Sequence, residues 1–448
     1  MCQTTRRGFL VGCSSAIASL AGARFNSLAF GSPSSTDEVM VVIFLRGGMD
    51  GLSLVMPIAG HPDRGYYEAA RPDIQVPTSG TSAALALASG FGVHPGAARL
   101  RDLYQAGHLA IVHAAGITGP EGATRSHFEA MDYLELGTPG NDGTTTGWLT
   151  RHLATADLPP AVTMPAIAIG GTQTTSLLGS RETINMESVG DFSLDTGPWN
   201  WRSMQRQALR ELYQGESIVH RTGLQTLDAV DIIELNASGT YTPANGAVYP
   251  SGSFGDQLKV VAQMIKLGLG LRVATLDLGG WDTHTYQGNG GTGYFGDMAG
   301  DLADGLHALY LDLDSGYTQR LTVLVQSEFG RRVRQNDDDG TDHGHGNLML
   351  VLSGHATPGF HGTWPGLRDD QLFEGADLAV TTDYRRVLSE ILIRRLGNPF
   401  LGSVFPGYVY PGPLGIVSGT DLPPDYSAPL FKDGFEDGSM SRWPARLG

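Results

Sequence analysis

Short apolar runs alternate with amphipathic stretches along most of the chain. The runs are typical of strands buried on both faces, and apolar residues at every third or fourth position between them predict helices that cover those strands. Strands that alternate with helices favour an α/β fold with a doubly wound, mainly parallel sheet flanked by helices. The predicted strands are 39–45, 109–114, 165–170, 271–278, 321–325 and 348–352. The predicted helices are 95–106, 125–136, 147–153, 203–213, 224–235, 254–267, 294–313 and 383–396.

Three other regions are more polar or less regular. Residues from about 180 to 250 hold two of the helices and are interpreted as a helical insertion into an α/β domain of residues 39–417. Residues 66–77 show no clear period of apolar positions and are interpreted as irregular. The Pro- and Asp-rich segment 418–448 is predicted to be a flexible tail, because it offers few apolar groups to bury.

Polar residues that suit chemistry follow several of the strands. Ligands of a doubly wound sheet bind beyond the carboxyl ends of its strands. Asp50, Ser126, the pair Asp282 and His284, and Glu328 each follow a different predicted strand. We therefore expect these side chains to meet on one rim of the sheet.

The segment between the last two predicted strands is the densest in metal-ligand types. It contains Glu328, Asp342, His343 and His345. Carboxylates and imidazoles are the usual protein ligands of divalent cations. The alternative is a solvated acidic loop, which is our interpretation of the run 337–339.

Ser126 stands where a helix is predicted to begin. Its hydroxyl could cap the helix, with Glu129 three residues on as in a capping box. The same position suits a nucleophile, since a helix amino end stabilises an alkoxide or a bound anion. The sequence leaves both roles open. Arg46 and Arg125 are candidates to clamp an anionic substrate in a bidentate manner.

The composition and net charge limit the classes of partner that the protein can bind. The 448 residues carry a formal net charge of −16, and 41% of them are hydrophobic, enough for a substantial core. Nucleic acid is excluded as a partner because its phosphates require a basic face. A small anionic substrate must then be attracted by a local positive centre such as a metal ion.

The first residues have the features of a twin-arginine export signal. Thr5 to Leu10 (TRRGFL) precede a weakly apolar stretch, and Ala21-Gly22-Ala23 offers a small-residue cleavage site. We interpret residues 1–23 as the signal peptide and 24–38 as a linker. The expected partner during export is the twin-arginine translocon, and the expected location is periplasmic or extracellular, with no transmembrane segment in the mature chain.

Both cysteines lie in this signal. Without Cys2 and Cys13 the mature chain has no disulfide, thiol nucleophile or thiolate ligand. The residues before Cys13 resemble a lipoprotein cleavage box, but they follow the arginine pair too closely to leave a hydrophobic region.

Several motifs, taken in order, resemble an exported bacterial family of unknown function in the alkaline phosphatase superfamily, alongside sulfatases and phosphomutases. Beyond the twin-arginine start they are FLRGGMDGLS, RSHFEAMDYLELG, LDLGGWDTH, SEFGRR, GTDHGHGN and TTDYRRVL, within residues 39–396. The resemblance implies an alkaline phosphatase-like fold, a Ser126 nucleophile, and one or two divalent ions (zinc, manganese, magnesium or calcium). The implied ligands are Asp50, Asp282 with His284, and Asp342 with His343.

Some features depart from that superfamily pattern. A final histidine ligand is implied, and His345, His355 and His361 compete for the role, while Glu328 stands as a further ligand candidate. The segment RSHFEA lacks the Pro- and Arg-bearing motif of sulfatases.

The expected function is an exported metal-dependent hydrolase of phosphate, phosphonate or sulfate esters that uses a serine nucleophile. The alternative is a secreted, non-catalytic binding or assembly protein that retains the fold.

Replacement of both Arg6 and Arg7 by lysine should retain unprocessed protein in the cytoplasm, because the arginine pair is an address read by the translocon. Cell fractionation with detection of the full-length and processed forms measures this. Normal secretion of the double variant would contradict the export prediction.

Overall fold

A computed structural model describes residues 38–427, except 141–142, 157, 159–163, 181, 190–198, 216–217, 238–239 and 315. The predicted signal peptide, most of the linker and residues 428–448 of the predicted tail lie outside the described part. A nine-stranded sheet forms the centre, in the order β11-β5-β10-β9-β1-β8-β6-β7, with β12 paired to β5. The strands are β1 (Val39–Leu45), β5 (Leu109–Gly116), β6 (Ala166–Ile169), β7 (Thr183–Met186), β8 (Val273–Leu278), β9 (Leu321–Ser327), β10 (Asn347–Ser353), β11 (Gly359–His361) and β12 (Thr382–Asp383).

The sheet is mainly parallel, which confirms the predicted α/β class. β1 lies between β8 and β9 and is parallel to both, with Val41 opposite Ala274 and Val323. β10 departs from the prediction of parallel neighbours, because it is antiparallel to both β9 and β5. The physical reason is that a parallel return requires a crossover, usually a helix, and the connection from β9 to β10 contains none. The amino end of β10 therefore lies on the same rim as the carboxyl ends of β1, β8, β9 and β5.

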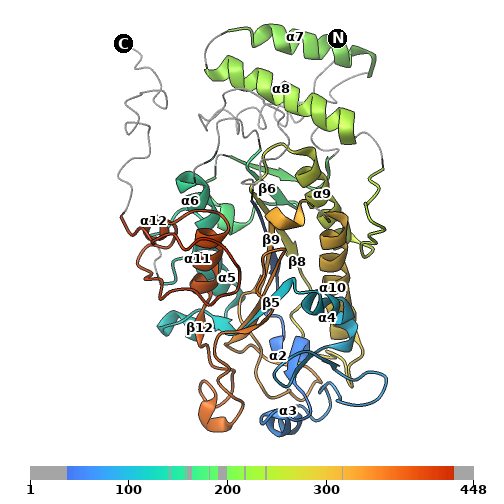
Figure 1. The fold of residues 1–448 in the computed structure, drawn as a ribbon, viewed down its shortest axis with the longest axis vertical. Helices are drawn as coiled ribbons and strands as arrows, with labels where there is room; N and C mark the ends of the chain where they lie inside the picture. The colour runs from blue at the N-terminus through green and yellow to red at the C-terminus, as the bar shows by residue number, and fades with distance from the viewer. Residues whose placement is uncertain are drawn as a thin grey trace.

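Helices cover both faces of the sheet (Figure 1). Alternate residues of β1 point to opposite sides, as the two-residue period of a strand requires. One set, which includes Val41 and Ile43, packs in the core with α4 (Ala98–Gln105), α9 (Ser253–Leu267) and α10 (Tyr294–Asp312). The other set, which includes Val42, packs with α5 (His127–Leu136), α6 (Trp148–Thr155), α11 (Tyr384–Arg394) and α12 (Leu401–Val404).

A smaller layer lies beside the carboxyl end of β1. It contains α2 (Gly51–Leu54), α3 (Arg64–Ala70) and a three-stranded sheet of β2 (Val55–Pro57), β4 (Phe91–Val93) and β3 (Leu85–Ala86). The interpretation of residues 66–77 as irregular is wrong for α3. This helix spans two turns and buries few side chains, so its apolar period is too short to detect.

The predicted insertion contains two helices, and the first residues of the predicted tail contact the domain. α7 (Arg202–Leu212) and α8 (Ile218–Ala237) lie at the opposite end of the molecule from α2 and α3 (Figure 1). Residues 418–427 contact the domain: Arg394 Nε lies 2.6 Å from Asp421 Oδ1, and the Gly402 N–H donates to the Asp425 carbonyl. The predicted flexible tail therefore starts too early.

Short 3-10 helices complete the described elements: η1 (Pro95–Ala97), η2 (Pro120–Ala123), η3 (Thr175–Leu177), η5 (Trp199–Trp201), η6 (Thr318–Arg320) and η7 (Asp369–Gln371). Among the residues that the structure describes, no helix has both the length and the apolar character needed to cross a membrane.

Candidate metal centre

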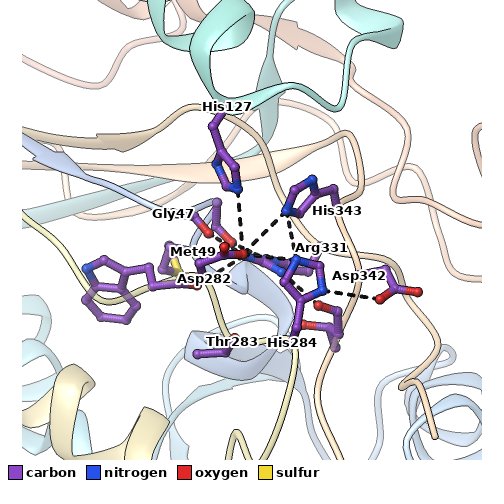
Figure 2. Close-up of polar contacts among 12 residues, drawn as sticks. Gly47, Met49, His127, Asp282, Thr283, His284, Arg331, Asp342 and His343 are labelled. Carbon is purple, nitrogen blue, oxygen red and sulfur yellow. Dashed lines mark hydrogen bonds and ion pairs between the residues drawn. The ribbon is translucent and has the colours of Figure 1, made fainter. Parts of the chain in front are cut away.

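Three imidazoles and one carboxylate converge on the rim of the sheet (Figure 2). His127 is the first residue of α5, Asp282 and His284 follow β8, and His343 precedes β10. One ligand atom from each of His127, Asp282 and His343 can be chosen so that all three lie within 4.8 Å of one another. His284 Nε2 lies 3.1 Å from Asp282 Oδ1 and 2.9 Å from His343 Nε2.

Each imidazole has an acceptor at its outer nitrogen. His127 Nδ1 lies 2.7 Å from Glu328 Oε1, and His284 Nδ1 lies 3.3 Å from Asp342 Oδ1. His343 Nδ1 lies 2.8 Å from the backbone carbonyl oxygen of Arg125. These acceptors favour the tautomer that carries its proton on Nδ1, which leaves the Nε2 lone pair free to bind a metal.

The donor set fits a divalent cation. Two Nε2 lone pairs that face each other at 2.9 Å repel unless something lies between them, and His127 Nε2 is buried without a hydrogen-bond partner. Nitrogens about 2.0–2.1 Å from a tetrahedral zinc ion lie roughly 3.3 Å from one another. The Asp282 Oδ1 atom lies 3.1 to 3.6 Å from the three Nε2 atoms. Three imidazoles and a carboxylate suit zinc better than the oxygen-seeking magnesium or calcium.

Local electrostatics set the protonation of these groups. The hydrogen bond to Glu328 raises the pKa of His127. Burial lowers the pKa of His343, and the nearby Arg331 acts in the same direction. Partial burial acts to raise the pKa of Asp282, but Arg331 outweighs it and holds that pKa below its usual value. Asp282 is therefore an anion at neutral pH.

Arg331 positions Asp282. Its side chain is buried, and its Nη2 lies 2.5 Å from Asp282 Oδ1. Its Nε donates to the Gly48 carbonyl at 2.6 Å and its Nη1 to the Thr341 carbonyl at 2.8 Å. The loop that contains Gly340 packs closely against the loop after β8. A Cβ at position 340 would lie only 2.2 Å from the His284 carbonyl oxygen, so this position requires glycine.

Asp50, expected to be a ligand, is buried in a separate ion pair. Both of its oxygens bond Arg71, at 2.6 Å to Nη1 and 3.0 Å to Nη2, and it also accepts from Ser53 and Gln287. Burial acts to raise the pKa of Asp50, and Arg71 outweighs this effect and lowers it. We leave Asp50 out of the ligand set.

The other predicted site residues take different places. Glu328 and Asp342 orient imidazoles, as described above. His345 lies against Phe373, with ring centroids 4.2 Å apart, and is not part of the centre. His361 contacts backbone carbonyls and His355 contacts Ser418.

The two candidate anion clamps are already engaged. Arg46 pairs with Glu135 at 2.8 Å and Asp277 at 2.9 Å. Arg125 pairs with Glu374 at 2.8 Å and Asp377 at 2.6 Å. In this arrangement both guanidinium groups are paired with carboxylates of the protein itself.

Ser126 is exposed and does not cap α5. Its side chain makes no capping bond, and Glu129 instead accepts from the Thr124 hydroxyl, so the predicted capping box is not formed. The Ser126 hydroxyl also has no hydrogen bond to any ligand candidate within the described residues. It stands one residue before His127.

Sequence reasoning missed His127. Like Ser126, this histidine follows a buried strand, and it opens helix α5. Its position after a strand, on the rim of the sheet, is the sequence feature that could have identified His127 as a candidate ligand.

Comparison with known proteins gives a family and two weak structural similarities. Residues 37–397 match the family described as "Protein of unknown function (DUF1501)". No curated protein matches the chain. One solved structure is described as a protein in the alkaline phosphatase superfamily from Vibrio parahaemolyticus; it is 9% identical with a TM-score of 0.30, and the match covers 94% of this chain and 80% of that one. Another, of Ps i-CgsB in complex with k-i-k-neocarrahexaose, is 11% identical with a TM-score of 0.31, covering 75% and 70%. These similarities are too weak to assign a function.

Replacement of Asp50 by asparagine should lower the free energy of unfolding by about 3 kcal/mol or more, because it leaves the Arg71 guanidinium buried without its counter-charge. Removal of Asp370, the exposed partner of Arg368, is the control and should leave the urea midpoint of unfolding close to that of wild type, because solvent screens this pair. Urea unfolding measures both.

The effect of Asp50 should also depend on pH. Because its pKa is lowered by folding, its contribution to stability is full above the unfolded carboxyl pKa, about 3.9, and is lost as the pH falls through the folded value. The difference between wild type and Asp50→Asn should therefore shrink in acid. An equal difference at pH 7 and in strong acid would contradict this assignment.

Proposed function

The chain belongs to the DUF1501 family, and from this premise and the geometry of its rim we propose that it is a metal-dependent hydrolase of phosphate, phosphonate or sulfate esters. His127, Asp282, His284 and His343 would hold one divalent cation. The observation that carries the proposal is the convergence of their ligand atoms, with every imidazole oriented by an acceptor behind it. Zinc suits this set best.

The centre is open to solvent, as a catalytic metal site must be. Side chains of Asp282 and His284 are 50% and 40% exposed. Three imidazoles are the ligand number of one kind of catalytic zinc site, and if Asp282 takes the fourth position, substrate would enter by expansion to five-coordinate geometry. The exposure supports a site that admits a ligand.

The metal ion and the residues around it would have different roles in the reaction. A bound cation would supply a Lewis acid that lowers the pKa of a hydroxyl and neutralises charge on the ester oxygens. Ser126 is the proposed nucleophile: its oxygen bonds the central atom as the ester bond breaks, and its proton passes to the departing alkoxide, which leaves as the alcohol. Water then hydrolyses the serine ester, which releases the acid and restores the serine hydroxyl. The free backbone N–H groups of the first turn of α5 are suited to anionic oxygens. Glu328 and Asp342 hold two imidazoles in orientation.

One observation favours a second candidate function. Arg46 and Arg125 are both held by carboxylates, so the proposed substrate anion lacks the clamp that the sequence suggested. A non-catalytic binding or assembly protein that keeps the ion would have no need of such a clamp.

We also propose export by the twin-arginine route to the periplasm or beyond, on the sequence features of residues 1–23.

Replacement of His343 by alanine should reduce bound zinc at least about 100-fold, because it removes one of the proposed ligands, while Asp342→Asn should cost about 10- to 100-fold through the orientation of His284. Metal content after dialysis against a zinc buffer measures both. His355→Ala, which changes a histidine outside the centre, is the control and should bind zinc as wild type does.

Ser126→Ala should abolish hydrolysis of 4-nitrophenyl phosphate, phenylphosphonate esters and 4-nitrophenyl sulfate with its metal retained. The reason is that the serine is the nucleophile and not a ligand. If wild type contains metal and hydrolyses none of these esters, the binding-protein alternative is supported. If folded wild type binds none of zinc, manganese, magnesium or calcium, the metal proposal itself fails.

A further inference from the structure

Helix α7, at one end of the molecule, turns an apolar stripe to solvent (Figure 1). Trp201 precedes the helix with right-handed helical backbone dihedrals, and Met204, Ala208 and Leu212 follow at steps of three or four residues, so the four lie on one face. Trp201, Met204 and Leu212 are 55%, 56% and 72% exposed, and Ala208 is exposed as well. We call these four residues the α7 stripe.

The charged face of α7 attaches it to the rest of the protein. Arg206 Nη1 lies 2.6 Å from Asp231 Oδ1, and Arg210 pairs with both Asp228 and Asp231 at 2.6 Å. These carboxylates belong to α8, whose Ile233 is buried in the core. The polarity of α7 is therefore the reverse of that of an ordinary surface helix, which turns its apolar face to the core and its charged face to water.

The contacts with α8 do not account for the stability of α7. The helix has 11 residues, and none of them is buried. Isolated helices shorter than about 12–15 residues are marginal in water, and most helical stability in proteins comes from the packing of an apolar face. Ion pairs that are open to solvent add little. The α7 stripe therefore has the features of a face that packs against a partner.

The width of the stripe favours a second helix over a lipid surface. Its positions at i, i+3, i+7 and i+11 are close to the spacing of a coiled-coil seam, which is narrower than the apolar face of most surface helices. Ser203, Gln207 and Glu211, which are exposed beside it, are polar. A helix that lies in a lipid surface presents basic residues to the headgroups. Here Arg206 and Arg210 are paired with carboxylates of α8 instead.

Two copies of the stripe complement each other when their helices run antiparallel. The midpoint of the stripe lies between positions 206 and 207, so Trp201 of one copy faces Leu212 of a second copy, and Met204 lies beside Ala208. Each pair places a larger side chain against a smaller one, which is how facing helices fill the space between them. The stripe is therefore complementary to itself, as a two-fold interface requires.

Charge favours the same partner. The chain carries a formal charge of −16, which opposes self-association over much of its surface. α7 has three arginines and one glutamate, and α8 has one arginine and three carboxylates, so the two helices together are formally neutral. Two copies that approach through this end of the molecule therefore repel each other only weakly.

We propose that two copies of this chain associate about a two-fold axis through the α7 stripe, with α7 packed against α7 in antiparallel orientation. The seam is short, so the interface buries less than about 1,200 Å², and the dimer dissociates in the micromolar range. α7 lies at the opposite end of the molecule from α2, which follows β1 at the rim of the candidate metal centre (Figure 1). The dimer therefore leaves both metal centres open to solvent.

Sedimentation equilibrium of the full chain, over roughly 1–200 μM, tests the association. We expect a reversible dimer. Met204→Glu with Leu212→Glu should raise its dissociation constant at least about 100-fold, because carboxylates of both copies would be placed in one apolar seam. Val248→Glu with Val409→Glu is the matched control, since it makes the same change of charge at two exposed apolar residues outside α7 and should dimerise as wild type does.

Engineered cysteines test the antiparallel orientation. In a chain with Cys2 and Cys13 replaced by serine, the two copies of position 208 lie about 4–5 Å apart along the helix axis, and those of position 212 about 16 Å apart. A short bismaleimide should therefore link Ala208→Cys into covalent dimers and leave Leu212→Cys unlinked. Linkage of both variants would indicate parallel helices and overturn the proposed arrangement.

Wild type that stays monomeric over the whole concentration range overturns the proposal, and so does a dimer that Met204→Glu with Leu212→Glu retains. Monomeric wild type that cosediments with phosphatidylcholine vesicles, where this double variant does not, would assign the stripe to a lipid surface instead. At concentrations where wild type is monomeric, both double variants should match its thermal unfolding, because none of the four residues is buried. Both should also keep the metal content and ester hydrolysis of wild type, so the result is independent of the proposed function.

Discussion

A buried guanidinium holds the rim of this sheet together. Arg331 bonds backbone carbonyls of the loop after β1, at Gly48, and of the loop before β10, at Thr341, and it pairs with Asp282 after β8. Burial of a charged group costs several kcal/mol unless it is paired and hydrogen-bonded, so these loops can adopt few other arrangements around it. The position of the candidate metal centre therefore depends on a residue that is not one of its ligands.

The sequence predicted the scaffold better than the partners within it. The apolar runs identified the central strands, because strands follow from period and length, and of the polar residues after them Asp282, His284 and Glu328 take part in the candidate centre. The pattern of apolar residues does not determine the direction in which a side chain points once the strand has ended. Asp50 follows β1 as a ligand would, yet its partner is Arg71, which only the tertiary fold brings to it. The direction of the His127 ring is likewise set by a distant residue, Glu328.

A bound cation would also resolve a conflict between the charge of the chain and that of the proposed substrate. A chain with a formal charge of −16 repels an anionic ester at long range, and its two candidate arginine clamps are paired with carboxylates. A divalent cation among neutral imidazoles would reverse the sign of the potential locally, at the point where the ester oxygens arrive. The outer acceptors matter as much as the ligands, because they hold the proton of each neutral imidazole on Nδ1 and aim its Nε2 at the centre.

X-ray absorption at the zinc edge, on protein loaded with one equivalent of zinc, tests the central claim most directly, because imidazole rings give a distinctive multiple-scattering pattern. The account predicts three imidazole nitrogens about 2.0–2.1 Å from the metal together with at least one oxygen at a similar distance. A first shell composed only of oxygen, or one with a single imidazole, would contradict the convergence of His127, His284 and His343 on one cation.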